Sequence, residues 1–228
     1  MCPLGRSRWW ALGFVSLAGA ATALTVLVQG SNLLPGELAV ARWLAEDPLP
    51  VAVDISEALG VGLDGRLAPL IFFALLPIVW RAWGRYAALT LLVAGGLTFV
   101  VRLAEFPYRP RPTDDLAWTL AVRGSSSYPS GHVVYAVLVF GLLAYLASRH
   151  LPRFWLSAVM VSVPAIIVIA MGPARIIDKD HWPADVAGGY LVSLPLLMGV
   201  IWAHVHLMSW LGRRAPRIYS VLGGKSAG

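Results

Sequence analysis

Two histidines in the chain have neighbours that suit chemistry on an anion. His181 precedes Asp185 by four residues, a spacing at which the carboxylate can hydrogen-bond one ring nitrogen and raise the basicity of the other. His132 ends a Pro-Ser-Gly-His segment, in which Ser130 suits a helix N-cap and Gly131 lets the backbone approach a ligand closely. A helix start also offers free N–H groups and a favourable dipole. These patterns indicate an anion-binding site containing a basic imidazole.

Each pattern also has a plainer explanation. Pro-Ser-Gly-His can be an ordinary helix start, and His181 with Asp185 can be an interfacial histidine beside a carboxylate at a helix N-terminus. Neither explanation accounts for Arg175, which stands six residues before His181.

Basic residues gather in the same two stretches of sequence as these histidines. They either anchor lipid headgroups or hold an anion, and planar guanidinium groups match phosphate oxygens in pairs. The residues are Arg102, Arg109, Arg111, Arg123, Arg175 and Lys179.

The composition predicts one membrane domain over residues 1–228. Of its residues 58% are hydrophobic and only 13% are charged, whereas a soluble domain carries about 25% charged residues. The net charge of +6 does not indicate a nucleic-acid partner, because the basic residues lie at the ends of apolar runs. The single cysteine, Cys2, has no partner for an internal disulfide and belongs to no zinc-binding pattern.

Apolar runs predict the fold class, an all-α bundle of six transmembrane helices. Their lengths and the lack of strict alternation favour helices over strands. The first run is longer than the apolar core of a signal peptide and is interpreted as a retained span. The runs cover residues 9–29, 66–80, 86–101, 131–147, 154–172 and 186–204.

The charges predict which ends of the spans face the cytoplasm. The N-terminus, the loops after the second and fourth spans, and an unstructured tail over 212–228 carry Arg and Lys but no acid. The positive-inside bias places these segments, and both termini, in the cytoplasm. The outer loops then cover residues 30–65, with a short surface helix over 51–59, and residues 102–130 and 173–185. This topology brings His132 and His181 to the same depth.

With these residues in place, the chain resembles the type 2 phosphatidic acid phosphatase superfamily, which also includes the vanadium haloperoxidases. The resemblance covers residues 36–205. The family's Pro-Ser-Gly-His motif is intact at 129–132, and its Ser-Arg-x5-His-x3-Asp motif matches 174–185, with Ala174 in place of Ser. Three motifs in order along one membrane face are far more specific than a single short match.

The family's first motif, Lys-x6-Arg-Pro, fits in either of two registers. Arg102 with Arg109 keeps a cation at both positions, although Arg replaces Lys, and this register is preferred. The alternative, Arg111 with its following proline, puts Ala104 at the lysine position. Arg111 is expected to share the site in either case.

The resemblance implies a lipid phosphatase that uses neither metal nor cofactor, with its site at the outer surface. His181 attacks phosphorus, Asp185 orients His181, and His132 protonates the leaving oxygen. The phosphate oxygens are held by Arg102, Arg109, Arg175, Ser130 and the backbone N–H of Gly131.

The sequence specifies the identity of the substrate less closely than the reaction. The expected partner is a lipid phosphate in the membrane, with undecaprenyl diphosphate slightly favoured over phosphatidylglycerol phosphate and phosphatidate on family analogy alone. Two other activities stay open: a phosphotransferase acting between lipids, and a non-catalytic binder or transporter of lipid phosphates. A haloperoxidase is disfavoured, because those relatives are soluble.

Overall fold

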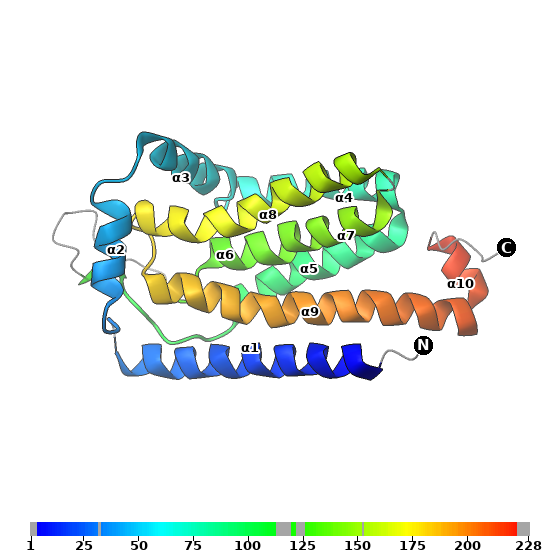
Figure 1. Cartoon of the computed structure of the whole chain (residues 1–228), viewed down its shortest axis with the longest axis horizontal. Helices are drawn as coiled ribbons and strands as arrows, with labels where there is room; N and C mark the ends of the chain where they lie inside the picture. Colours follow the sequence, from blue (N-terminus) through cyan, green and yellow to red (C-terminus); the bar gives the residue numbers. More distant parts are fainter. Residues whose placement is uncertain (1–3, 32, 113–119, 122–125, 152, 223–228) are drawn as a thin grey trace.

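The protein is a bundle of long helices with a cap of shorter elements at one end (Figure 1). The computed structural model describes residues 4–31, 33–112, 120–121, 126–151 and 153–222. In order along the chain, the elements are α1 (Leu4–Gly30), α2 (Glu37–Ala45), α3 (Pro50–Gly62), α4 (Leu67–Trp83), α5 (Arg85–Leu103), β1 (Arg111–Pro112), β2 (Leu120–Ala121), α6 (Gly131–Tyr135), η1 (Ala136–Gly141), α7 (Leu142–His150), α8 (Phe154–Ile177), α9 (Pro183–Arg214) and α10 (Pro216–Val221).

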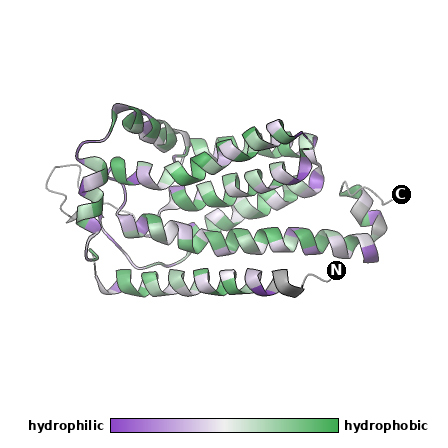
Figure 2. Ribbon diagram, in the orientation of Figure 1, coloured by the Kyte–Doolittle hydropathy of each residue, from purple (hydrophilic) through white to green (hydrophobic). Residues whose placement is uncertain are grey.

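The predicted all-α membrane architecture is confirmed. Within the described residues, five helical segments are long and apolar enough to cross a membrane, and the bent pair of α3 and α4 makes a sixth. The two helices of that pair meet at 74°. With 17 residues, α4 alone spans about 26 Å, close to the ~30 Å of a hydrocarbon core. Hydrophobic residues extend along the long helices, and hydrophilic ones gather toward their ends (Figure 2).

The fourth span is the core of the bundle. It consists of α6, η1 and α7, which run without a break from Gly131 to His150. The side chains from Val133 to Val139 are almost wholly buried, whereas only 6% of the residues in the apolar windows of α1 and α8 are buried. The π-helical turn η1 lies one turn beyond His132, and such turns often occur near functional sites.

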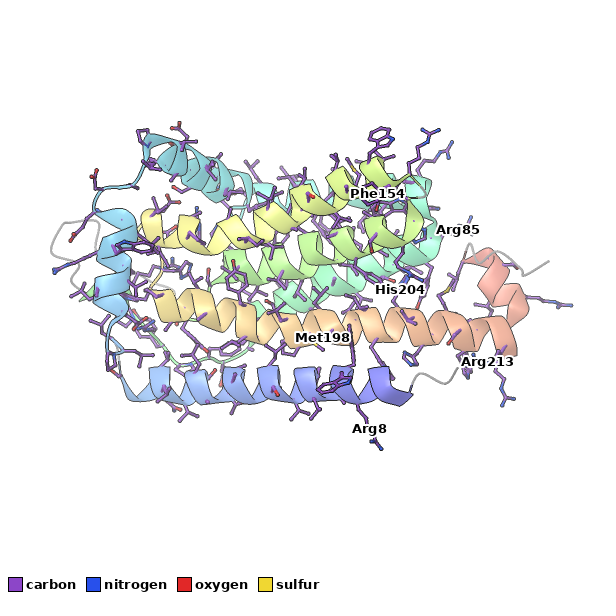
Figure 3. The ribbon with its side chains drawn as sticks, in the orientation of Figure 1. Arg8, Arg85, Phe154, Met198, His204 and Arg213 are labelled. Atoms are coloured by element: carbon purple, nitrogen blue, oxygen red, sulfur yellow. The ribbon has the colours of Figure 1, made fainter. Side chains whose placement is uncertain are left out.

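The two ends of the bundle are formed by different elements. The start of α1 and the whole of α10 lie at one end, opposite α2 and the starts of α6 and α9 (Figure 1). Arg85 and Arg213 lie at this first end, and Arg8 is on the first turns of α1 there (Figure 3). Met198 of α9 points toward α1 in the same view, and a Cβ built at Gly13 would be 3.5 Å from its Cε atom.

The structure adds details that the sequence did not predict. The predicted surface helix is present as α3, but α2 was not foreseen. The tail was expected to be unstructured from Gly212, and this was wrong: α9 continues to Arg214 and α10 follows. Residues 223–228, Arg123 and the Asp114-Asp115 pair lie outside the described residues.

Glycines on α9 let the start of α6 approach closely. A Cβ at Gly189 would lie 2.9 Å from Val133 and 3.1 Å from the backbone oxygen of Ser130. A Cβ at Gly188 would overlap the ring of Tyr128. Small residues at such positions are how membrane helices pack without a hydrophobic driving force.

This packing predicts that Gly189→Ala destabilises the protein by about 1–3 kcal/mol, because the new methyl group meets the branched side chain of Val133 and the backbone oxygen of Ser130. The matched control is Gly199→Ala on the same helix, where a Cβ meets nothing within 4 Å. Thermal unfolding in detergent should show a lower melting temperature for Gly189→Ala alone. Equal melting temperatures for the two variants would contradict this account of the helix contact.

Candidate active site

A cavity of about 780 Å³ opens at the capped end of the bundle. His132, His181 and Gly131 line it, together with Arg102 and Arg111. The rest of the cavity runs between α4 and α5, where it is lined by apolar side chains and by Gly95 and Gly96. The two histidines, 49 residues apart in sequence, therefore share one cavity.

Four buried polar atoms have no hydrogen-bond partner among the residues that the structure describes, and two of them belong to the histidines that line the cavity. The four atoms are Ser130 Oγ, His132 Nε2, Arg175 Nε and His181 Nδ1. A buried polar atom without a partner costs about 1–3 kcal/mol, and native proteins contain few of them. All four belong to residues that the sequence assigned to phosphate chemistry. A bound oxyanion supplies acceptor oxygens of the kind that hydroxyl, guanidinium and imidazole groups can bind.

Asp185 lies next to His181, but the contact between them is loose. The Nδ1 atom of His181 is 3.7 Å from Oδ2 of Asp185, beyond ordinary hydrogen-bond length. Contacts of this kind are often long before a substrate binds. Asp185 is the third residue of α9, where it accepts a hydrogen bond from the backbone N–H of Trp182 at 2.7 Å, and Pro183 begins the helix.

Ser130 occupies the N-cap position predicted for it, but its hydroxyl does not cap the helix. Instead its backbone N–H donates to the Asp185 carbonyl oxygen at 3.0 Å, which ties the start of α6 to the start of α9. Gly131 follows, and a Cβ built there meets nothing within 4 Å. Ser130 Oγ and the space in front of Gly131 are thus both available to a ligand.

The arginines of the first motif take different positions. Arg102 and Arg111 line the cavity, and Arg111 also donates to the backbone oxygen of Asp180 at 3.0 Å. Arg109 does not line the cavity: it is fully buried, ion-paired with Glu37 and donating to Asp185 at 2.7 Å. Of the preferred register, Arg102 thus lines the cavity, whereas the guanidinium of Arg109 is engaged by two carboxylates. The cavity cations are Arg102 and Arg111.

The charges around Arg109 keep it ionised. Burial lowers the pKa of its guanidinium, but the charges and hydrogen bonds of Asp185 and Glu37 outweigh burial and leave the pKa raised above its ordinary value. Arg109 is therefore a permanent cation behind the cavity.

Arg175 is held tightly at the edge of the site. Its guanidinium pairs with Asp178, donates to the backbone oxygen of Ser56 at 2.8 Å and lies 3.3 Å from Asp180. Gly60 of α3 packs directly over it, because a Cβ there would lie 2.5 Å from the guanidinium. Only Nε of Arg175 stays without a partner in the described chain.

Several residues that organise the site were missed by sequence reasoning. Glu37 and Ser127 both bind the Arg109–Asp185 group, and Trp182 is fully buried beside His181 with its indole N–H donating to the Pro110 oxygen at 3.0 Å. Asp178 pairs with Arg175. In the described parts of the chain, no three His, Cys, Asp or Glu side chains come together as a metal site would require.

Comparison with known protein families identifies the relatives of this chain. A family model described as the PAP2 superfamily matches residues 83–209, which is more than half of the chain. The chain belongs to the PAP2 superfamily. The match includes every cavity-lining residue named above and leaves out Glu37.

Among proteins of this superfamily, the chain is similar to phosphatidylglycerophosphatase B of Bacillus subtilis, at 36% identity over 95 residues. This alignment spans 41% of the chain and 45% of that relative, or about half of its length. A crystal structure of a transmembrane PAP2 type phosphatidylglycerolphosphate phosphatase from Bacillus subtilis has the same fold, with a TM-score of 0.68 at 20% identity. The superposition covers 82% of this chain and 93% of that structure.

The open space at Gly131 predicts that Gly131→Ala folds normally but weakens the binding of orthovanadate, a phosphate analogue, by about 10-fold or more. The added methyl group would occupy the approach to the helix N-terminus without meeting any protein atom. Gly96→Ala is the control, because Gly96 also lines the cavity and is equally open but lies on α5. Isothermal titration calorimetry in detergent measures the orthovanadate affinity of both variants. An unchanged affinity in Gly131→Ala would show that Gly131 is not part of the anion site.

Proposed function

We propose that this PAP2-superfamily protein is a lipid phosphatase that forms a phosphohistidine at His181. The cluster of unpartnered polar atoms carries the proposal, because a phosphoryl group bonded to Nε2 of His181 could bind Ser130 Oγ, His132 Nε2 and Arg175 Nε, while Nδ1 of His181 faces Asp185. Soluble phosphate esters would also suit such a cluster. The apolar part of the cavity, which continues between two membrane helices, favours a lipid.

In the proposed first step, Nε2 of His181 attacks phosphorus in line with the leaving oxygen. The N–P bond forms as the P–O bond to the lipid breaks, and His132 gives a proton to the departing oxygen. Asp185, close to Nδ1 of His181, stabilises the positive charge that develops on the imidazole. In the second step His132 takes a proton from water, which attacks the phosphohistidine and releases inorganic phosphate.

Cations and N–H groups stabilise the transferring phosphoryl group. Negative charge is spread over its equatorial oxygens in the transition state, so fixed positive groups account for much of the catalysis. Arg111 supplies a guanidinium from the cavity wall, and Arg175 supplies its Nε from the edge. Ser130 and the N–H of Gly131 complete the proposed set.

The apolar part of the cavity is the proposed seat of a lipid tail. Its lining on α5 reaches Leu92, ten residues from Arg102, which corresponds to about 15 Å of helix. This is roughly half of the ~30 Å hydrocarbon core, the depth of one leaflet. Phe73 and Phe99 line this part and are also exposed on the outside of the bundle, which favours entry of the tail from the side.

The favoured substrate is phosphatidylglycerol phosphate, because both relatives described above carry names that refer to it. Undecaprenyl diphosphate, slightly favoured by the sequence alone, is the second candidate. Both lipids carry a second phosphate beside the one that is removed, whereas phosphatidate does not. Arg102 lines the same cavity, and a Cβ at Gly65 would lie 4.0 Å from its guanidinium, so this side chain reaches across the mouth toward the α3–α4 turn. A second phosphate at the mouth would suit it.

The protein is proposed to lie in the cell membrane with both termini in the cytoplasm. The basic residues at the α10 end of the bundle support this orientation under the positive-inside rule. The site then faces the outer leaflet.

The mechanism predicts that purified protein releases phosphate from lipid phosphates in the presence of EDTA, and that His181→Ala reduces the rate by at least about 10³-fold. An acid-labile phosphoenzyme should form in the wild type and be absent from His181→Ala. His206→Ala is the control, because His206 is exposed at the opposite end of α9. Phosphate found on a lipid acceptor would favour the phosphotransferase, and binding without turnover would favour the binder. Strong dependence on Mg²⁺ would contradict the mechanism.

The proposed contact between Arg102 and a second phosphate of the lipid predicts a substrate-dependent effect of Arg102→Gln. We expect kcat/KM to fall about 10-fold for phosphatidylglycerol phosphate and undecaprenyl diphosphate, and by much less for phosphatidate, because only the first two place a second phosphate near this guanidinium. Arg66→Gln, an exposed change at the same end outside the cavity, should leave all three unchanged. An equal loss on all three lipids would assign Arg102 to the transferred phosphate instead.

A further inference from the structure

A buried ionic group lies directly behind the site and extends it to α2. Arg109 and Asp185 are fully buried, and Glu37 is only 6% exposed. Arg109 is paired with Glu37 on one side and donates to Oδ1 of Asp185 at 2.7 Å on the other. Asp185 is in turn the carboxylate nearest to Nδ1 of His181. The four side chains form a continuous series from α2 to the cavity.

Glu37 also fixes the backbone around this series. Its Oε1 accepts the N–H of Ala184 at 2.8 Å, and its Oε2 accepts the N–H of Leu34 at 2.6 Å as well as the guanidinium of Arg109. Ala184 directly precedes Asp185 in the first turn of α9. One carboxylate therefore positions both the cation that binds Asp185 and the helical turn that carries Asp185.

The charge count explains why a second carboxylate is useful there. Asp185 paired with Arg109 alone would be a neutral pair, with little negative charge left for His181. With Glu37, the group contains two carboxylates and one guanidinium, which leaves one net negative charge to balance the charge developing on the attacking imidazole. Burying three charges is costly, so their retention favours a functional role over a stabilising one.

From this geometry we infer that Glu37 is a positioning residue for the nucleophile: through Arg109 and the first turn of α9 it sets the orientation and charge of Asp185. The inference rests on the proposed function, and it adds a residue that lies outside the matched family region. Glu37 does not touch the phosphoryl group. Its effect belongs to kcat and to the formation of the phosphoenzyme, and not to lipid binding.

The test compares Glu37→Gln with the matched control Glu46→Gln, which makes the same change on an exposed carboxylate directly after α2. Glutamine keeps the shape but offers one acceptor oxygen where three donors now bind. Turnover of phosphatidylglycerol phosphate should show kcat reduced about 10-fold or more in Glu37→Gln, with KM changed less than about 2-fold. Glu37→Asp, which keeps the charge, should recover part of the kcat and serves as the working variant if the glutamine variant does not fold.

A double-mutant cycle separates positioning from a general loss of stability. In an Asp185→Asn background the charge that Glu37 organises is absent, so adding Glu37→Gln should slow phosphoenzyme formation by less than about 2-fold. The same fold-loss in both backgrounds, or a wild-type kcat in Glu37→Gln, overturns the inference while leaving the proposed function intact. Absence of phosphate release from the wild type would instead reject the proposed function itself.

Discussion

The site and the bundle both depend on the ion pair and hydrogen bonds of one buried residue, Asp185. Its carboxylate binds Arg109, the Ser127 hydroxyl and the backbone N–H of Trp182, and its carbonyl oxygen accepts the N–H of Ser130. One residue at the start of α9 thus links the loop before β1, the segment before α6 and the start of α6. In a low-dielectric interior such a charge must be fully paired, so the elements that pair it are fixed relative to each other.

The membrane bundle makes this arrangement possible by bringing helix starts together at one level. The glycines of α9 allow α6 to approach until Ser130 and Asp185 are hydrogen-bonded. On the other side, α3 crosses the end of α8, where Ser56 binds Asp178 and Arg175 and where only a glycine at position 60 leaves room for the guanidinium. The short helix α3 therefore covers the charged contacts of Arg175 at the end of α8.

Much of this could be predicted from the sequence, because long apolar runs and positively charged loops follow directly from the physics of the bilayer. The spans, the surface helix α3 and the N-cap position of Ser130 were all predicted. Topology alone predicted that His132 and His181 lie at the same depth, and in the structure they share one cavity. These features depend on local pattern, so the sequence contains them.

The rest depended on contacts between distant segments. The Arg109-Pro-Arg111 repeat looks symmetric in sequence, and the arginine that is buried is the one bound by Glu37, 72 residues earlier, and by Asp185, 76 residues later. The unused capping hydroxyl of Ser130 could not be foreseen for the same reason. Nothing in the neighbouring sequence distinguishes the buried Glu37 from the exposed acids of residues 30–65.

The central claim is that Ser130, His132, Arg175 and His181 surround one phosphoryl group. A structure of the full chain in lipid with bound orthovanadate tests it most directly. The account predicts vanadium within bonding distance of Nε2 of His181, with Ser130 Oγ and Arg175 Nε on its oxygens and His132 on the opposite side. Vanadate bound elsewhere, or His132 and His181 too far apart to flank one vanadium atom, would contradict it.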